Sequence, residues 1–148
     1  MSSGSYILIA DTAEGCLVLQ SALASEFATT CVTTMSELNE AIRQRRPDLV
    51  VCGCHFDEGR MYEALRLLRV QPPRTAFLAV RALSGELDDA VYEGVKIATR
   101  ALDGDGFVDL FRWRRKYGAE SANERLVALV RQLVAANQAD TQWDSTTD

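Results

Sequence analysis

The sequence has 148 residues and a formal net charge of −5, with 47% hydrophobic and 25% charged residues. This length fits one domain with a buried core, and the acidic balance argues against a surface built for wholesale nucleic-acid binding. No apolar run approaches the roughly 20 residues that span a bilayer, and the N-terminus lacks the basic region and apolar core of a secretory signal. The four cysteines lie in or beside apolar segments without the spacing of a secreted disulfide framework, so we expect a reducing cytoplasm.

Short apolar runs predict buried strands, and apolar residues that repeat at helical spacing predict helices between them. Strands are expected at residues 6–10, 28–33, 49–52 and 75–80. Helical patterns lie at residues 18–23, 38–42, 61–68, 87–91 and 126–134. A fifth, weak strand is expected within residues 95–102, after a Gly94 that suits the end of a helix, and a turn at residues 103–106 follows it.

Strands that alternate with helices in this way predict an α/β fold. The expected architecture is a doubly wound, five-stranded parallel sheet with right-handed crossovers and helices on both faces. We expect a single domain over residues 5–136 and a polar C-terminal tail over residues 137–148 that frays.

The stretch at residues 47–59 is the most informative part of the chain. Pro47 ends the helical pattern before it, and residues 49–52 form a continuous apolar run of the kind that suits a strand buried on both faces. Gly53 follows at the expected carboxyl end of that strand, and ionisable residues come directly after it. Because ligands of open α/β sheets bind at the carboxyl ends of the strands, we expect any functional site at this edge.

Three stretches resemble the receiver domains of bacterial response regulators, and the resemblance covers about residues 5–134. The stretches are residues 7–11, residues 47–51, and residues 79–82 with Gly94 farther on. The resemblance implies a flavodoxin-like sheet with the strand order 2-1-3-4-5 and a place in two-component signal transduction.

Working receivers use an acidic pair after the first strand and an aspartate at the end of the third to hold Mg²⁺, and that aspartate accepts a phosphoryl group from a histidine kinase. A Ser or Thr after the fourth strand and a Lys-Pro pair after the fifth sense the phosphoryl group. The matching positions here are Asp11, Thr12, Gly53, Arg81 and Arg100. Only Asp11 keeps the residue type of the family. The resemblance therefore implies a pseudo-receiver that lacks the phosphoacceptor, with no metal, no cofactor and no enzymatic activity expected.

Several ionisable side chains near this edge have alternative interpretations. Arg81 and Arg100 could pair with Asp11 in the space that a phosphoacceptor would fill, bind a small anion, or face solvent. Asp57 could be a displaced carboxylate for phosphorylation, or lie in a solvated loop before the next helix. Cys54 could act as a thiol sensor near Asp11 or have no reactive role.

An insertion near residues 104–120 interleaves basic and aromatic side chains where receivers usually have a short link. Its candidate interface residues are Phe111, Trp113, Arg114 and Tyr117. Such residues anchor protein interfaces or stack on nucleic-acid bases, and they can also simply pack on the domain. We favour an interface or packing over nucleic acid because the chain is acidic. In the family, the fourth helix, fifth strand and fifth helix form the usual output and dimerisation face, and the insertion is expected on or beside it.

The first functional hypothesis is a phosphorylation-independent signalling module that binds a protein partner, or a second copy of itself, through that face. The second is a regulatory domain that binds a small anionic ligand at the strand-end pocket. A receiver phosphorylated at a displaced carboxylate is a further alternative. An enzyme is the weakest hypothesis, because residues 11–15 are not a glycine-rich phosphate loop and no nucleophile–base pair stands out.

Overall fold

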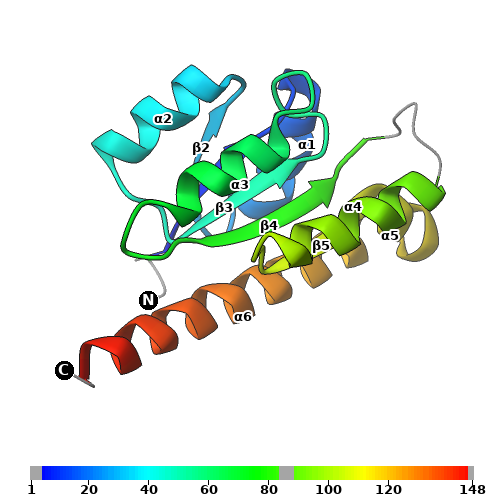
Figure 1. Ribbon diagram of the computed structural model, residues 1–148. Helices are drawn as coiled ribbons and strands as arrows, with labels where there is room; N and C mark the ends of the chain where they lie inside the picture. The colour runs from blue at the N-terminus through cyan, green and yellow to red at the C-terminus, as the bar shows by residue number, and fades with distance from the viewer. Residues whose placement is uncertain (1–4, 84–88, 147–148) are drawn as a thin grey trace.

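The computed structural model describes residues 5–83 and 89–146, which form a five-stranded parallel sheet with helices on both faces (Figure 1). The strand order is β2-β1-β3-β4-β5, so the predicted α/β sheet of order 2-1-3-4-5 is confirmed. The strands are β1 (Tyr6–Ala10), β2 (Ala28–Val32), β3 (Leu49–Gly53), β4 (Ala76–Arg81) and β5 (Gly106–Asp109). The helices are α1 (Ala13–Leu23), α2 (Met35–Gln44), α3 (Met61–Arg69), α4 (Asp89–Ala101), α5 (Leu110–Tyr117) and α6 (Ala119–Thr146).

The position of each strand in the sheet follows from its sequence. Strands β1, β3 and β4 are buried at every residue, as their continuous apolar runs predict for central strands of a covered parallel sheet. Strand β2 pairs only with β1 and exposes part of its threonine-rich sequence, which is typical of an edge strand. The central position of β1 and β3 brings Asp11 and Gly53 to the same edge of the sheet, because Ala10 lies opposite Cys52.

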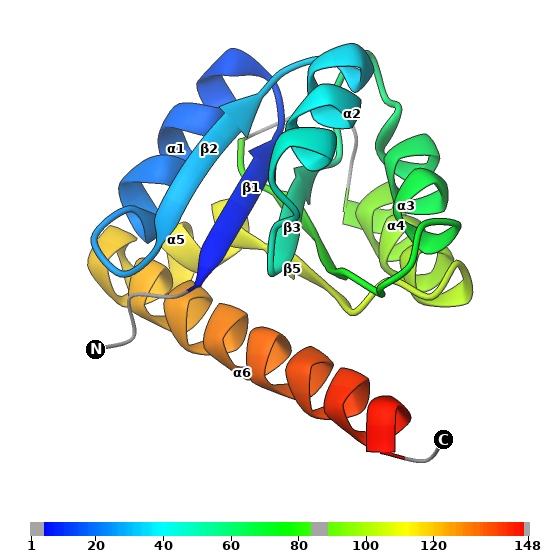
Figure 2. The same cartoon turned by 90° about the vertical axis from the view of Figure 1, so that its left-hand side faces the viewer.

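Two layers of apolar side chains cover the two faces of the sheet. Alternate residues of each strand point to opposite faces, so Ile7 and Val51 face one layer while Leu8 and Val50 face the other. Helices α1 and α6 complete the first layer, and α2 and α3 complete the second, as Figure 2 shows from the edge of the sheet. Both layers end at the loops that follow the carboxyl ends of the strands. That edge of the sheet is therefore accessible to a ligand or a partner.

The predicted fifth strand within residues 95–102 is wrong, because residues 95–101 belong to α4 and Leu102 follows it in a turn. Their β-branched side chains suggested a strand, but Thr99 is buried and Ile97 is 67% exposed, as on a two-faced helix. The Thr99 hydroxyl donates to the carbonyl of Val95 one turn earlier, at 2.8 Å. Gly94 therefore lies inside the helix rather than after it, and Leu87, which was also predicted as helical, lies outside the described residues. The fifth strand is Gly106–Asp109.

The polar C-terminal segment is helical rather than frayed, since α6 continues to Thr146 and extends past the sheet in Figure 1. The side chain of Asn137 explains why the helix stays attached beyond the apolar pattern. Its amide donates to the carbonyl of Arg74 at 3.0 Å, and its oxygen accepts from the Arg74 guanidinium at 2.9 Å. In the described ranges, no helix is both long and apolar enough to cross a membrane.

Candidate functional site

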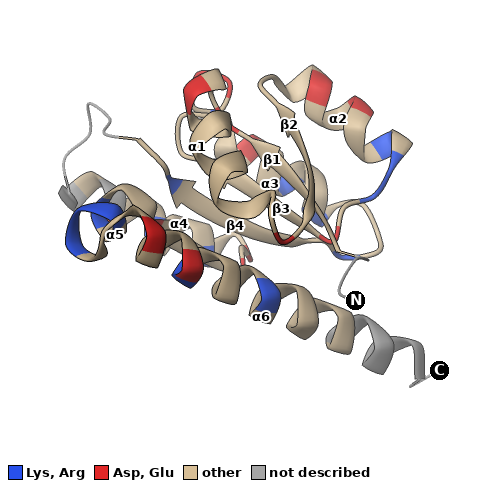
Figure 3. Cartoon of the chain, turned by 180° about the vertical axis from the view of Figure 1, so that it is seen from behind, with Lys and Arg blue, Asp and Glu red and all other residues tan. Residues whose placement is uncertain are grey.

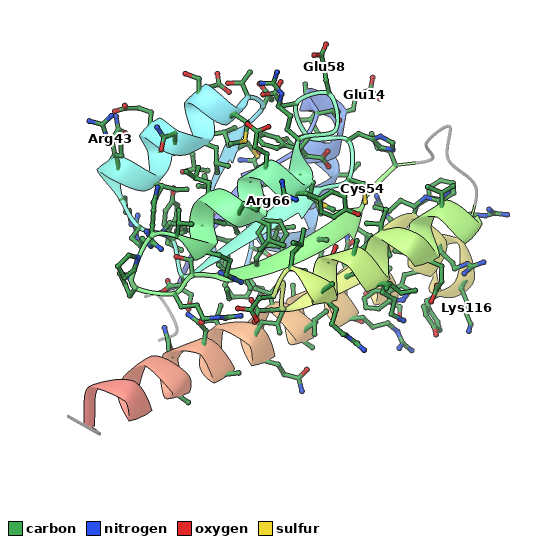
Figure 4. The ribbon with its side chains drawn as sticks, in the orientation of Figure 1. Glu14, Arg43, Cys54, Glu58, Arg66 and Lys116 are labelled. Carbon is green, nitrogen blue, oxygen red and sulfur yellow. The ribbon has the colours of Figure 1, made fainter. Side chains whose placement is uncertain are left out.

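A cavity of about 360 Å³ opens at the carboxyl ends of the central strands. It is lined by Asp11, Thr12, Ala13, Glu14, Cys54, His55, Ala82 and Leu83. Figure 4 labels Glu14 and Cys54 at this end of the sheet. The predicted site edge therefore exists, and its ionisable lining is acidic apart from the single histidine.

The carboxylate of Asp11 lies directly against the backbone of two glycines. A Cβ atom at Gly53 would lie 2.1 Å from both Cγ and Oδ1 of Asp11, and a Cβ atom at Gly15 would lie 2.0 Å from Oδ2. These separations are far below any van der Waals contact, so Asp11 occupies the volume that a side chain at Gly53 would need. The position that matches the phosphoacceptor is thus filled by the neighbouring acid.

Asp11 is held as a buried acid with one hydrogen bond from its own loop. The side chain belongs to a residue that is 4% exposed, and its Oδ1 accepts from the Thr12 N–H at 2.7 Å. Burial raises the pKa of Asp11 from 3.8 to about 6, and the Thr12 hydrogen bond opposes only part of that rise. The Asp11 carboxyl is consequently poised to change its charge in mildly acidic solution.

The residues at this edge do not fit the Mg²⁺ site of working receivers. Thr12 replaces the second acid, and its hydroxyl caps α1 by accepting from the Gly15 N–H at 3.1 Å. Gly53 offers no side-chain oxygen, and Asp11 is turned against the two glycines. Within the described ranges no group of three or more His, Cys, Asp or Glu side chains could hold a metal ion.

The Arg81 guanidinium forms an ion pair with Asp109 at the end of β5. Its Nη1 is 3.0 Å from Oδ2 of Asp109, which is the residue opposite Arg81 in the β4–β5 register. The guanidinium also lies over the ring of Phe111, 5.1 Å from the ring centroid. Because it is absent from the lining of the strand-end cavity, Arg81 belongs to a second site formed with α5.

Arg100 also lies away from the cavity. It occupies the exposed last turn of α4 and was placed at the end of a strand only because the fifth strand was predicted too early. The true fifth strand ends at Asp109, and the fully buried Leu110 follows it. No basic side chain therefore ends this strand, where working receivers have their lysine.

Asp57 and Cys54 have structural surroundings that their sequence context did not indicate. Oδ2 of Asp57 accepts from the Met35 N–H at 2.8 Å and lies 3.6 Å from the Arg60 guanidinium, so this carboxylate ties its loop to the start of α2. Burial first, and then the charge of Asp11, raise the pKa of the Cys54 thiol to about 12. Such a thiol stays protonated at neutral pH, which argues against a reactive thiolate sensor.

The predicted insertion near residues 104–120 contains β5 as well as helix α5, so only residues after Asp109 are added between the fifth strand and the final helix. The aromatic residues of α5 have different surroundings. Trp113 is half-buried and packs against the core, while Tyr117 is 36% exposed beneath the Arg125 guanidinium, which lies 3.8 Å from its ring centroid. Phe111 lies near two guanidiniums, those of Arg81 and Arg115. Helix α5 thus has both packed and exposed aromatic side chains, and the predicted interface residues remain candidates for a protein contact.

A groove of about 290 Å³ lies between α4, β5 and α5. It is lined by Glu93, Lys96, Phe107, Val108, Asp109, Arg112 and Trp113. The exposed Ile97 lies beside it, one helical turn after Glu93. The family's fifth helix corresponds to the final helix, α6, so this groove lies on α4 and β5 beside the predicted output face.

Sequence reasoning missed Asp109, which organises the end of β5. Its Oδ1 accepts from the Arg112 N–H at 3.0 Å as the N-cap of α5, while Oδ2 pairs with Arg81. The signal was present in the sequence, because an aspartate that follows an apolar pair and precedes a helical segment is a common N-cap. Gly15 was also missed, since its contact with Asp11 follows from packing alone.

Comparison with known proteins rests on structure alone. No family model matches the sequence, and no curated protein matches it. A response regulator from Thermotoga maritima has a TM-score of 0.66 and 16% identity, over 88% of this chain and 98% of that one. The signal receiver domain of a protein from Vibrio parahaemolyticus has a TM-score of 0.68 and 12% identity, over 95% of this chain and 96% of that one.

A longer protein, NtrX from Brucella abortus, matches with a TM-score of 0.73 and 13% identity. The match covers 97% of this chain but only 29% of the NtrX chain. These identities are low, so the similarities establish the fold and nothing finer. The chain has the fold of response-regulator receiver domains.

Proposed function

We propose that this chain is a receiver-like signalling module that works without aspartate phosphorylation and acts through contacts with another protein. The observation that carries the proposal is the Asp11 carboxylate packed into the space beside Gly53. A receiver signals when a phosphorylated side chain at this position shifts its output face. Here that position has no side chain, and Asp11 fills the space beside it. The conformation of the output face is therefore set by the fold itself and not by phosphorylation.

The remaining switch positions support the same proposal. Thr12 is engaged as a helix cap, Arg81 pairs with Asp109, and Leu110 is buried after the fifth strand. Each of these side chains stabilises one fixed arrangement. The four cysteines are unpaired thiols, which fits the reducing cytoplasm that we propose as the setting.

The groove between α4, β5 and α5 is the face that we propose for the protein contact. It contains a half-buried Trp113 and Arg112, and tryptophan and arginine are residue types that are enriched at protein interfaces. The exposed Ile97 beside it adds apolar area that costs little to bury against a partner. A second copy of this chain is the first partner to test.

The cavity at the strand ends does not support the alternative of a small anionic ligand there. Among the described residues, its acidic lining residues are Asp11 and Glu14, and no lysine or arginine lines it. These carboxylates would repel an anion. The same burial that raises the pKa of Asp11 also disfavours a further negative charge beside it.

Ile97→Asp is expected to weaken self-association by about tenfold or more, because a carboxylate would have to be desolvated in the contact. Sedimentation over a range of protein concentrations measures the effect. Leu17→Asp is the matched control, since Leu17 is 69% exposed on α1 and lies away from the proposed face. Ile97 is a better probe than Trp113, whose removal would also disturb the core. A wild-type protein that stays monomeric, or equal weakening by both variants, would contradict self-association through this face.

A further inference from the structure

A second cavity, distinct from the one at the strand ends, has a cationic lining. It has a volume of about 580 Å³. It is lined by Arg81, Phe111, Arg112, Arg115 and Lys116. Of the described lining side chains four are basic and none is acidic, although the whole chain carries a net charge of −5. Figure 3 shows the basic residues gathered on α5 beside the acidic start of α6.

Arg81 and Arg115 have contacts that position their guanidiniums beside Phe111. Asp109 pairs with the 8% exposed Arg81 side chain and also caps α5, so one carboxylate positions both the guanidinium and the helix. The guanidiniums of Arg81 and Arg115 lie 5.1 Å and 5.6 Å from the centroid of the Phe111 ring. This arrangement limits the entropy that the arginine side chains would lose on binding a ligand.

Two of the four cations have no carboxylate partner in the described part of the chain. Arg115 contacts the Phe111 ring and Lys116 contacts the Tyr117 ring, and neither forms an ion pair there. The positive charges of Arg115 and Lys116 repel each other, and an anion bound between them would relieve that repulsion. The cavity therefore contains two cationic side chains that are available to pair with an anionic ligand.

From this geometry we infer that the cavity binds a small polyanion that carries linked phosphate groups. Guanidiniums match phosphate oxygens with paired hydrogen bonds, and a lysine adds a mobile point charge. Two linked phosphates offer one group to each of Arg115 and Lys116, the two cations without a carboxylate partner in the described residues, whereas a single phosphate must serve both. The site lies beside the proposed protein-binding groove, and Arg112 lines both. The inference does not depend on the proposed function.

The test is isothermal titration of the full chain with inorganic pyrophosphate, followed by amide NMR. Wild type is expected to bind with shifts at residues 111–116. The double variant R115Q/K116Q, which changes two exposed side chains, is expected to bind roughly tenfold more weakly or worse. The matched control is R43Q/R66Q, which removes the same charge from the exposed surfaces of α2 and α3, where Figure 4 labels both residues far from Lys116.

Three further ligands separate the alternatives. ADP and pyrophosphate both carry linked phosphates, so tighter binding of either one than of sulfate supports the inference. The difference between ADP and pyrophosphate shows whether a nucleoside contributes to binding. Sulfate that binds as tightly as pyrophosphate would overturn the assignment to linked phosphates. A polyglutamate peptide that binds more tightly than pyrophosphate would overturn it in favour of an acidic protein partner. Equal weakening in the two double variants, or no binding at millimolar pyrophosphate, would also overturn it.

Discussion

Replacing Gly53 with alanine is expected to destabilise the fold by about 1–3 kcal/mol, the usual cost of overpacking a filled site. The new Cβ atom would lie 2.1 Å from the Asp11 carboxylate, which must then move out of its position between two glycines. Its hydrogen bond with the Thr12 N–H would be strained by that movement. Urea unfolding at neutral pH measures the loss in the free energy of unfolding.

A double-mutant cycle isolates the cause of that loss. In an Asp11→Ala background the nearest atoms to the new Cβ are gone, so Gly53→Ala is expected to cost little, with a coupling of about 1 kcal/mol or more between the two positions. Gly94→Ala is the control for the same chemical change, because a Cβ there meets nothing within 4 Å in α4. It is expected to stabilise the helix by about 0.5–1 kcal/mol. An equal cost for Gly53→Ala in both backgrounds would show that Asp11 does not fill this space.

Asp11→Asn is expected to stabilise the protein by up to about 3 kcal/mol at pH 8, with a gain that disappears near pH 4. The pKa of Asp11 is about 6 in the folded protein and 3.8 ordinarily, so folding favours the protonated carboxyl. Its contribution to stability is complete below about pH 3.8 and is lost as the pH rises through 6. Asparagine has the same shape, can still accept from the Thr12 N–H, and carries no charge at any of these pH values.

Urea unfolding of wild type and variant at pH 4, 6 and 8 measures this effect. Other titrating groups act on both proteins alike, so the difference between the two free energies of unfolding reports on Asp11 alone. That difference is expected to grow with pH between about pH 4 and pH 7. A difference that stays constant, or that shrinks as the pH rises, would mean that Asp11 is not a desolvated acid in the folded state.

The sequence predicted those parts of the fold that depend on local pattern. The apolar runs at β1, β3 and β4 are continuous because both faces are buried, and this signal gave the sheet and the location of its functional edge. Residues 95–101 misled the prediction because a β-branched helix with one buried face has the composition of a strand. The helical C-terminal segment was missed because it depends on Asn137 and its tertiary contact with Arg74.

Only part of the candidate site was predicted, since Asp11 and Thr12 line the strand-end cavity and Gly53 contacts Asp11, whereas Arg81 and Arg100 are absent from its lining. Asp11 and Gly53 were placed at one edge by strand alternation, and the structure puts them in direct contact. The direction of Arg81 could not be predicted, because it is set by an ion pair with Asp109 across the β4–β5 register. The cationic cavity requires that register, which has no local signal, and the start of α5, whose N-cap signal at Asp109 was missed.

The central claim is that this fold cannot carry a phosphoryl group at the receiver position. Intact-mass measurement after incubation with acetyl phosphate and Mg²⁺ tests it most directly, on wild type and on Gly53→Asp. Neither protein is expected to gain the mass of a phosphoryl group, because Asp11 fills the space and Thr12 supplies no second acid. A working receiver treated in parallel verifies the reagent. A phosphoryl adduct on Gly53→Asp would show that the position is open, and an adduct on wild type would show that another carboxylate, such as Asp57, accepts the group.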